Sequence, residues 1–367
     1  MTRGIGVSAF EWNLDHARHL PVETYVIANT RSTRLTKSDD DRGSRGHVCD
    51  LLTSDEPMEL KDLPRSLLIV GGGYIALELG QMFRRFGSEV TILERSAQLL
   101  AHSYEPEVGL TLAEIFAEEG IRVVTQAAVT RVHADAGEVV ASARLGGREQ
   151  TFRAENILVA TGRRPNTDTI GLERAGVSGN ARGEVEVDEF LRTTVPHIFA
   201  AGDVIGRETQ SQMATPVGSR DGGIAAHNAL SGGPLRRVDH RVIPRVIFTD
   251  PQAAVVGLTE EAVVSAGHPC WCRTLPMALV PRAGAIRETR GFVKMVADAD
   301  SHEVLGVSMV GHNASEVIHE AAMALHFRAR LQDFIDLLHV CPTMAEALKL
   351  IALSRFKDLT KLSCCAE

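Results

Sequence analysis

Two glycines and an alanine stand at a fixed spacing early in the chain. Gly71, Gly73 and Ala76 fill the pattern G-x-G-x-x-G/A, directly after the apolar run of residues 67–70. In such a turn the first glycine permits a tight bend, the second lets the backbone approach a pyrophosphate, and the small third residue lets the following helix pack on the strand. The N-terminus of that helix offers unpaired N–H groups and a partial positive charge. The spacing therefore predicts a site for the pyrophosphate of a dinucleotide, with a purely structural turn as the alternative.

An acidic residue ends the next apolar stretch, about twenty residues after the glycines, where a ribose-binding carboxylate is expected. Glu94 at this position would accept hydrogen bonds from the adenosine ribose hydroxyls, which favours NAD(H). Arg95 follows it and could instead pair with a 2′-phosphate, which favours NADP(H). The two signals conflict, so the sequence predicts NAD(P)H and leaves the preference between NADH and NADPH open.

The six cysteines are the other residues that could do chemistry. Their spacing fits neither a paired C-x-x-C zinc site nor a small disulfide scaffold, so most are expected to be thiols, each one alone a small buried hydrophobe. The adjacent pair Cys364–Cys365 is different, because only two residues follow it. A chain terminus is usually exposed, and two exposed thiols are a liability unless they have a use. The six positions are Cys49, Cys270, Cys272, Cys341, Cys364 and Cys365.

The composition is that of a globular protein with no strongly charged partner. The 367 residues are 44% hydrophobic and 23% charged, and they suffice for two or three domains. A net charge of −8 with a pI of about 6.0 argues against nucleic acid or an anionic membrane as the main partner. We find no run of about 18 apolar residues and no signal peptide, so the sequence predicts a cytoplasmic protein.

The elements that must position the glycine turn alternate between strands and helices. Residues 67–70 form a continuous apolar run, as in a parallel strand buried on both faces. Apolar residues then recur at helical spacing until Gly87, where the helix is expected to end. A strand over residues 90–93 and a helix over residues 106–120 follow, and short strands complete this α/β unit. The predicted apolar face of the first helix consists of Ile75, Leu79, Met82, Phe83 and Phe86.

The regions on either side have a different pattern. Residues 31–47 are polar and turn-rich and are predicted to be loop or disorder, whereas residues 24–28 could form an isolated strand. Residues 214–230 are rich in Ala and Gly and predict a closely packed helix. After Pro244 the pattern changes to strands followed by helices, which suggests a separate α+β domain. These strands are expected at residues 246–248, 253–256, 292–296 and 304–310.

Five motifs, taken in order, resemble those of the pyridine nucleotide–disulfide oxidoreductases, a family that includes lipoamide dehydrogenase, glutathione reductase and mercuric reductase. The resemblance covers roughly residues 50–367. The tail LTKLSCCAE (359–367) is similar to the C-terminus of mercuric reductases, where a vicinal cysteine pair receives Hg(II). Hg(II) is a soft cation that prefers thiolates, although cysteines that are incidental to a tail are the alternative. The five motifs are GGGYIALELG (71–80), VATGRRPNT (159–167), FAAGDV (199–204), FTDPQAAVVG (248–257) and PTMAEALKL (342–350).

The resemblance implies roles for residues of the glycine turn. Gly71, Gly73, Glu94 and Arg95 would lie around NAD(P)H, and Tyr74 would be the aromatic ring that gates the nicotinamide pocket. Ala76 would keep its packing role at the start of the helix.

A second set of residues is implied to surround FAD. Glu78 matches a buried glutamate that supports a lysine near the flavin, with a helix-surface charge as the alternative. Gly162 belongs to the ATG turn, and Gly202 and Asp203 match the turn whose aspartate binds the ribityl chain, with an ordinary turn residue as the alternative. A helix that begins near Ala214 would point its N-terminus at the flavin pyrimidine, where negative charge develops. The implied cofactors are therefore FAD and NAD(P)H.

Cys341 stands where lipoamide dehydrogenase and glutathione reductase carry a catalytic histidine and where mercuric reductases usually carry an aromatic residue. A thiol cannot serve as a histidine-like base, so Cys341 is expected to be either a further soft ligand for Hg(II) or a buried cysteine. Glu346 matches the glutamate that orients the histidine, but it also completes a capping box with Thr343, and the capping role is favoured. The implied catalytic residues are Cys341, Glu346, Cys364 and Cys365, of which the last two would bind Hg(II).

The implied fold is α/β: a Rossmann-like NAD(P)-binding domain inserted in a partial FAD-binding domain, followed by an α+β dimerisation domain. The first 62 residues contain neither the G-x-G-x-x-G that holds the ADP half of FAD nor the C-x-x-x-x-C of the redox disulfide. They are therefore interpreted as a truncated or scrambled remnant. The expected domains are residues 1–62 (remnant of the FAD-binding domain), 63–185 (NAD(P)-binding domain), 186–244 (return segment of the FAD domain) and 245–367 (dimerisation domain with the Cys-Cys tail).

Three functional hypotheses follow. The leading one is a homodimeric, mercuric reductase-like flavoprotein in which NAD(P)H reduces Hg(II) to Hg(0) through FAD. Cys364–Cys365 of one subunit would deliver Hg(II) to the other subunit, although this chain alone is expected to bind FAD weakly and to turn over little. A dihydrolipoamide dehydrogenase-type disulfide reductase is the second hypothesis, opposed by the terminal pair and by Cys341. The third is a non-catalytic dimer that binds nucleotide or sequesters Hg(II).

Overall fold

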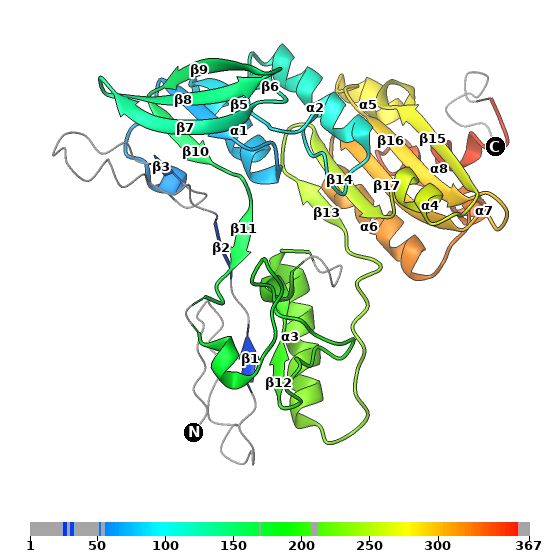
Figure 1. Ribbon diagram of the computed structural model, residues 1–367. Helices are drawn as coiled ribbons and strands as arrows, with labels where there is room; N and C mark the ends of the chain where they lie inside the picture. Colours follow the sequence, from blue (N-terminus) through cyan, green and yellow to red (C-terminus); the bar gives the residue numbers. More distant parts are fainter. Residues whose placement is uncertain are drawn as a thin grey trace. The chain divides into compact units, whose positions relative to one another are not determined.

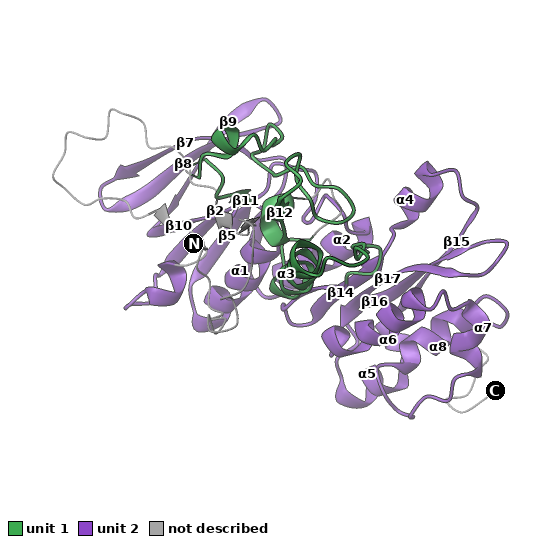
Figure 2. Cartoon of the chain, turned by 90° about the horizontal axis from the view of Figure 1, so that it is seen from below, with its two compact units in different colours: residues 1–33, 162–243 green, residues 34–161, 244–367 purple. Residues whose placement is uncertain are grey.

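Two compact units make up the chain. The computed structural model describes residues 25–27, 30–32, 51–52, 56–168, 170–206 and 212–358 (Figure 1). Unit 1 comprises residues 1–33 and 162–243, and unit 2 comprises residues 34–161 and 244–367 (Figure 2). The predicted Hg(II) ligands Cys364 and Cys365 lie outside the described residues, as does Cys49.

Unit 2 contains a five-stranded parallel sheet in the order β3-β10-β4-β5-β6. β4 is central, and its apolar run is buried on both faces, as predicted. Leu67 and Ile69 share a core cluster with helices α1 and α2, whereas Leu68 and Val70 pack against the antiparallel sheet β7-β8-β9. The glycine turn follows directly at the carboxyl end of β4. The bounds are β3 (Leu51–Leu52), η3 (Glu56–Glu59), β4 (Ser66–Val70), α1 (Tyr74–Phe86), β5 (Glu89–Leu93), α2 (Pro106–Glu118), β6 (Arg122–Val124), β7 (Ala128–Asp135), β8 (Glu138–Leu145), β9 (Arg148–Ala154) and β10 (Asn156–Val159).

Helix α1 forms where it was predicted, but the face that packs on the sheet matches the predicted one only in part. Ala76 and Gly80 lie against the strands, where a Cβ on Gly80 would come within 3.2 Å of an isoleucine on β4. Of the predicted apolar face only Phe83 is buried, and Phe86 is 64% exposed. Leu77 is buried as well, and Leu79 and Met82 are partly buried against the same core. The small residues were overlooked because the prediction relied on large apolar side chains, whereas close contact between helix and strand requires small ones.

The second part of unit 2 is an antiparallel sheet in the order β13-β14-β17-β16-β15, with helix α6 on β14 and β17 and helix α8 on β15 and β16 (Figure 1). On the opposite face, the directly paired residues Ile247, Ala253, Val310 and Phe292 belong to the same core cluster as α1 and α2. The two sheets of unit 2 therefore share a core. The bounds are β13 (Arg245–Ile247), β14 (Gln252–Gly257), α4 (Glu260–Ser265), β15 (Cys270–Pro276), η6 (Met277–Leu279), α5 (Pro281–Ile286), β16 (Phe292–Asp298), β17 (Val304–Gly311), α6 (Ala314–His326), α7 (Leu331–Asp336) and α8 (Glu346–Leu353).

The four strands predicted after residue 244 are confirmed, but strand β15 was missed. Cys270 and Cys272 on this strand form a disulfide, so the expectation that these two residues are separate thiols is wrong. Residues two apart on a strand project from the same face, which brings the two sulfur atoms together. Because β15 has exposed polar residues in its middle, its alternation did not stand out as a strand signal.

Unit 1 contains two pairs of short strands. β1 pairs with β12 in parallel, and β2 pairs with β11 in antiparallel fashion. The possible strand at residues 24–28 is therefore not isolated, and the loop predicted for residues 31–47 is wrong at its first two positions. Both pairings join segments far apart in the chain, which local sequence patterns cannot reveal. The bounds are β1 (Tyr25–Ile27), β2 (Thr30–Ser32), β11 (Arg163–Pro165) and β12 (Ile198–Ala200).

One long helix completes unit 1. α3 (Thr215–Leu230) confirms the helix predicted at residues 214–230, and it packs on β12 and on the short helix η5 (Gly202–Ile205). Buried Ala225 of α3 belongs to the core cluster that contains β12. The short helix η4 (Leu172–Ala175) contributes only Leu172 to that cluster.

The return from unit 1 to unit 2 between residues 243 and 244 lies within one residue of the boundary expected at residue 245, whereas the other changes of unit differ from the expected boundaries. The chain passes from unit 2 to unit 1 between residues 161 and 162, whereas the boundary expected at residue 185 lies inside unit 1. Residues 51–52 and 56–59, expected in the remnant of the FAD-binding domain, belong to unit 2. β3 explains part of this difference, because it adds an edge strand to the parallel sheet beside β10.

Candidate functional site

The glycine turn at the end of β4 requires glycine at its first position. Gly71 has a φ of +113°, and its N–H donates to Leu93 O at 2.9 Å. A Cβ on Gly71 would lie 2.4 Å from Ala160 O, and a Cβ on Gly72 would lie 2.8 Å from Glu94 Oε2. The turn is thus enclosed by the ends of β5 and β10, and a side chain at Gly71 would displace backbone.

Gly73 leaves the approach to α1 open. Its backbone is extended, with φ −86° and ψ 178°, and it precedes α1 without a side-chain cap. A Cβ built on Gly73 would meet no protein atom within 4 Å. The first N–H groups of a helix have no acceptors within the helix, so this cradle of backbone fits a pyrophosphate. Tyr74, the first residue of α1, is half-buried against the adjoining core, and its role as a nicotinamide gate stays a prediction.

Glu94 and Arg95 stand beside the turn. Glu94 Oε1 accepts a hydrogen bond from the N–H of Ser96 at 2.7 Å, and Oε2 lies over Gly72. The Glu94 side chain is half-buried, whereas Arg95 is exposed. A fixed acceptor for ribose hydroxyls and an exposed guanidinium for a 2′-phosphate are therefore both present, and the nucleotide preference stays open.

One side of α1 holds the loop that follows β13. Glu78 Oε1 accepts from the N–H of Phe248 at 2.8 Å. The Gln81 amide donates to Asp250 O at 2.9 Å and accepts from the N–H of Asp250 at 2.8 Å. Arg85 Nη1 lies 2.8 Å from Asp250 Oδ2. Since these three side chains are spaced three and four residues apart, they share one helix face and fasten the FTDPQ motif to α1.

Glu78 is partly buried on this face of α1. Burial raises the pKa of Glu78 above its ordinary value, and the hydrogen bond from the N–H of Phe248 offsets part of that rise. The carboxylate of Glu78 thus accepts from a backbone N–H, and its support of a lysine near the flavin stays a prediction. Glu78 holds the loop after β13 against the helix that begins at the glycine turn.

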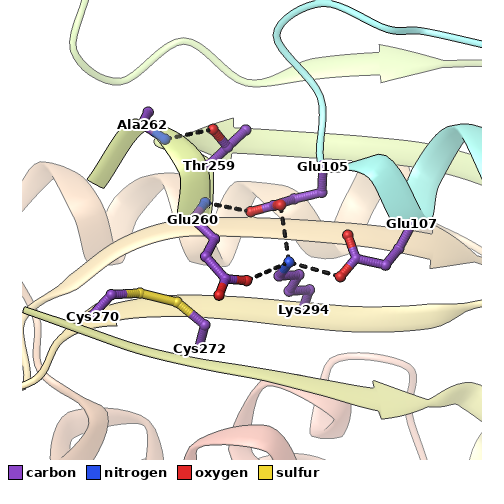
Figure 3. Close-up of a disulfide and its surroundings, with 8 residues drawn as sticks. All are labelled: Glu105, Glu107, Thr259, Glu260, Ala262, Cys270, Cys272 and Lys294. Carbon is purple, nitrogen blue, oxygen red and sulfur yellow. Dashed lines mark hydrogen bonds and ion pairs between the residues drawn. A yellow bond between two sulfur atoms is a disulfide. The ribbon is translucent and has the colours of Figure 1, made fainter. Parts of the chain in front are cut away.

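A buried ion cluster that the sequence reasoning missed joins α2 to the antiparallel sheet (Figure 3). Lys294 Nζ, on a side chain 5% exposed, lies 3.0 Å from Glu105 Oε2 and 2.8 Å from both Glu107 Oε1 and Glu260 Oε2. Burial lowers the pKa of Lys294, but the hydrogen bonds to Glu107, Glu260 and Glu105 outweigh it, so the net shift is upward. A lysine within the apolar strand FVKMVAD (292–298) was the available signal, because a buried charge requires partners.

Unit 1 brings the predicted flavin-binding turns together. Gly162 and Gly202 have positive φ angles of +129° and +75°. Arg163 Nε, which follows the first turn, lies 4.0 Å from Asp203 Oδ2 in the second. A Cβ on Gly218 in the first turns of α3 would lie 3.4 Å from Gly202 Cα, so the start of α3 adjoins the same turn. The convergence fits a site for the flavin ribityl chain, and that assignment stays a prediction.

The segment before α8 contradicts one of the two expectations for Cys341 and leaves the other, a further ligand for Hg(II), as a prediction. Cys341 is exposed, so the buried alternative is wrong. Glu346 Oε2 accepts from the N–H of Thr343 at 2.9 Å, which is one half of the predicted capping box. Thr343 Oγ1 is buried with no recorded hydrogen bond, and the residue before α8 is Ala345, so the reciprocal half is absent among the described residues. Glu346 therefore orders the loop that carries Cys341.

A histidine two residues earlier was not predicted as a site residue. His339 has a ring 4% exposed, with Nε2 2.9 Å from Glu320 Oε1 and Nδ1 3.2 Å from Leu337 O. The bond to Glu320 ties this loop to α6. The sequence shows that His339 lies shortly before Pro342 and Thr343, but it does not show that His339 pairs with a glutamate on α6.

Within the described ranges, no group of three or more His, Cys, Asp or Glu side chains is arranged to hold a metal ion. The same part of the chain contains no helix that is both long and apolar enough to span a membrane. The predicted Hg(II) site at Cys364 and Cys365 is outside these ranges and is tested by neither observation.

Known proteins resemble both parts of the chain. Residues 7–225 match the family model described as pyridine nucleotide-disulphide oxidoreductase, and residues 243–352 match the dimerisation domain of that family. The chain is 41% identical to the mercuric reductase of Staphylococcus aureus over 317 residues, which are 86% of this chain and 57% of that protein. It is 35% identical to the dihydrolipoyl dehydrogenase of Geobacillus stearothermophilus over 296 residues, which are 81% of this chain and 62% of that protein.

A solved structure shows the same architecture. The HOCl-induced flavoprotein disulfide reductase RclA from Escherichia coli superposes with a TM-score of 0.78 at 29% identity, covering 91% of this chain and 74% of that chain. The chain spans less than two thirds of the length of the two curated relatives, at 57% and 62%.

Proposed function

Because the chain belongs to the pyridine nucleotide-disulphide oxidoreductase family, we propose that it acts in a homodimeric flavoprotein that reduces Hg(II) to Hg(0) with NAD(P)H. Family membership implies FAD and NAD(P)H as the cofactors. The observation that carries the proposal is the glycine turn, where Gly71 and Gly73 leave the first amides of α1 accessible to a pyrophosphate. The 41% identity to a mercuric reductase and the terminal cysteine pair support Hg(II) as the substrate.

Unit 2 would bind the pyridine nucleotide. The amides at the start of α1 would receive the pyrophosphate, Glu94 or Arg95 would bind the adenosine ribose end, and Tyr74 would cover the nicotinamide. When bound, the nucleotide supplies a hydride and the flavin relays two electrons toward the substrate. The protein contributes orientation, because the turn is enclosed by backbone and α1 is fastened to the loop after β13.

Unit 1 would bind the flavin. Asp203 would accept hydrogen bonds from the ribityl hydroxyls, and Arg163 at 4.0 Å would help to hold its carboxylate in place. The N-terminus of α3, next to Gly202, would place partial positive charge near the flavin pyrimidine. These roles extend the predicted contacts and are part of the same proposal.

The cysteines near the C-terminus would carry the metal. Cys364 and Cys365 of one subunit would bind Hg(II) as thiolates and pass it to the active site of the partner by ligand exchange. The exposed thiol of Cys341 offers a further thiolate for that transfer. Ligand exchange of this kind moves the ion without changing its oxidation state.

The dimer would form through the domain that matches the family's dimerisation model, residues 243–352. Large apolar side chains are exposed on α6 and on the loop that His339 ties to α6. Exposed apolar side chains that gather on one part of a domain are typical of an interaction surface. The apolar surface consists of Met323, Phe327, Leu338 and Val340.

The test is NAD(P)H oxidation by the full chain supplied with FAD, with HgCl₂ as acceptor and Hg(0) vapour measured in parallel. Because this chain alone is expected to bind FAD weakly, we expect slow Hg(II)-dependent oxidation. It should slow further in the Cys364→Ala/Cys365→Ala variant and not in the matched Cys49→Ala variant. Binding of NAD(P)H alone is measured separately by fluorescence. Failure to bind NAD(P)H contradicts the assignment of the glycine turn, and tight Hg(II) binding without NAD(P)H oxidation supports a non-catalytic dimer instead.

A disulfide reductase of the dihydrolipoamide dehydrogenase type is the second candidate, supported by 35% identity to such an enzyme. Cys341 opposes it, because a thiol cannot replace the catalytic histidine expected at that position. Faster NAD(P)H oxidation with lipoamide than with HgCl₂ would favour this candidate.

A further inference from the structure

The disulfide between Cys270 and Cys272 lies on an edge strand and includes none of the residues assigned to nucleotide, flavin or the terminal metal pair. β15 is the last strand of its sheet, and it pairs on one side only, with β16. The two cysteines are separated by one residue, with a Cα–Cα distance of 6.0 Å. Both side chains are half-buried, and the residues before them, 264–269, are exposed. The disulfide therefore lies in a partly exposed part of the sheet edge.

This disulfide contributes little to holding the strand in place. Stabilisation by a disulfide grows with the length of the chain loop that it closes, and this loop contains only three residues. β15 is already held by a register of seven paired residues with β16, from Cys270 opposite Asp298 to Pro276 opposite Phe292. A bond that is not needed for the fold and lies in a partly exposed position is suited to reversible chemistry.

The register fixes where the two sulfur atoms point. In the pairing of β15 with β16, Thr274 is opposite Lys294 and Cys272 is opposite Val296. Side chains of directly opposed residues lie on the same face of a sheet, so the side chains of residues 270, 272 and 274 project from the face that also carries Lys294. Figure 3 shows the disulfide on the same side of the sheet as the Glu260–Lys294 ion pair. Two thiols that are fixed on one face by the strand can bind one ion together without reordering the backbone.

We propose that Cys270 and Cys272 form a redox-controlled site for a soft, two-coordinate cation of the Hg(II) class. In the closed state, the disulfide binds no metal. Two molecules of a small thiol reduce it: the Cys270–Cys272 bond breaks, the two cysteines gain two electrons and two protons, and the small thiols become one disulfide. The open pair then binds one Hg(II) through two thiolates and releases two protons. This site does not depend on NAD(P)H oxidation and does not rest on the function proposed above.

The test isolates the pair in a full chain with Cys49, Cys341, Cys364 and Cys365 all replaced by Ser. Thiols are counted with a chromogenic disulfide reagent before and after treatment with dithiothreitol and its removal. HgCl₂ is then added without oxygen and followed by the ultraviolet absorbance of the Hg–thiolate bond. We expect the thiol count to rise from about zero to about two per chain, and about one Hg(II) to bind only after reduction.

The matched control is the Cys270→Ser variant in the same background, which leaves Cys272 as a single thiol. We expect the reduced pair to retain Hg(II) against glutathione at least tenfold better than this control, because chelation by two thiolates raises the effective thiol concentration. If about two thiols per chain react before dithiothreitol is added, the proposed control of the site by a disulfide is wrong. Equal retention by the pair and by Cys270→Ser, with circular dichroism showing both folded, would overturn the shared site. Neither measurement uses a nucleotide, so it is independent of whether Hg(II) is reduced.

Discussion

Replacing Gly71 and Gly73 separately by alanine distinguishes the part of the turn that the fold requires from the part that a ligand requires. A Cβ on Gly71 would lie 2.4 Å from Ala160 O, with the backbone at φ +113°. Holding a residue with a side chain in such a region costs about 1–3 kcal/mol, and forced overpacking costs about 1–3 kcal/mol more. Gly71→Ala should therefore lower the free energy of unfolding of unit 2 by about 2–6 kcal/mol.

Gly73→Ala should change the stability little and weaken nucleotide binding. The backbone of Gly73 is extended and no protein atom lies within 4 Å of the added Cβ, so we expect a loss of stability below about 1 kcal/mol. The methyl group would stand where the pyrophosphate approaches α1. The Kd for NAD(P)H should then rise at least about tenfold, or about 1.4 kcal/mol.

Urea unfolding followed by tryptophan fluorescence measures the stability difference. The chain has two tryptophans, and Trp271 on β15 reports unit 2 in a Trp12→Phe background. With a slope of about 3 kcal/mol per M, Gly71→Ala should lower the midpoint by about 0.7–2 M. Fluorescence titration with NADH and NADPH measures the Kd of each variant. A Gly71→Ala protein as stable as the parent, or a Gly73→Ala protein with an unchanged Kd for both nucleotides, would refute the reasoning.

Three further changes test the contacts around the turn and the proposed dimer. Lys294→Met leaves three clustered carboxylates without their cation and should cost about 3–5 kcal/mol in urea unfolding. Arg153→Met removes the cation of an exposed pair and should leave the unfolding midpoint nearly unchanged, so equal shifts in the two variants would argue against the cluster. Burial raises the pKa of Glu78 above its ordinary 4.5. Between the pKa of the unfolded state and the higher pKa of the folded state, the folded protein keeps a proton that the unfolded protein has lost, so the free energy of unfolding falls as the pH rises. Glu78→Gln keeps a hydrogen-bond acceptor but has no proton to lose. The free energy of unfolding of this variant, relative to that of the parent, should therefore increase from about pH 4 to about pH 7. Parallel curves of stability against pH would contradict a raised pKa at Glu78. Leu338→Asp with Val340→Asp should convert a dimer to a monomer in sedimentation while unit 2 keeps its unfolding midpoint; an unchanged dimer would place the interface elsewhere.

The glycine turn was predictable because its signal is local. A buried strand, three small residues and a helix occupy consecutive positions, and each imposes its own residue preference. The same holds for α3, where a run of small residues predicted close packing and Gly218 does approach the backbone of Gly202. The capping pair Thr343 and Glu346 was also local, yet only one of its two bonds forms among the described residues.

What the sequence could not predict depends on partners far along the chain. Lys294 finds its carboxylates at Glu105 and Glu107, nearly two hundred residues earlier, and at Glu260. The face of α1 that packs on the sheet combines small and large residues, so the large apolar side chains alone located it only in part. The disulfide between Cys270 and Cys272 required knowing that residues 270–276 form a strand, because only a strand places both sulfur atoms on one face.

Helix α1 connects the proposed nucleotide site at the glycine turn to the proposed dimer surface. Its N-terminus forms the cradle after the glycine turn, and Glu78, Gln81 and Arg85 hold the loop between β13 and β14. β14 in turn pairs with β17 and lies under α6, the helix that carries part of the exposed apolar surface. Each step in this path is made of backbone pairing or side-chain bonds within unit 2. A dimer formed through that surface would therefore fix the distance between the two nucleotide turns, whatever the position of unit 1.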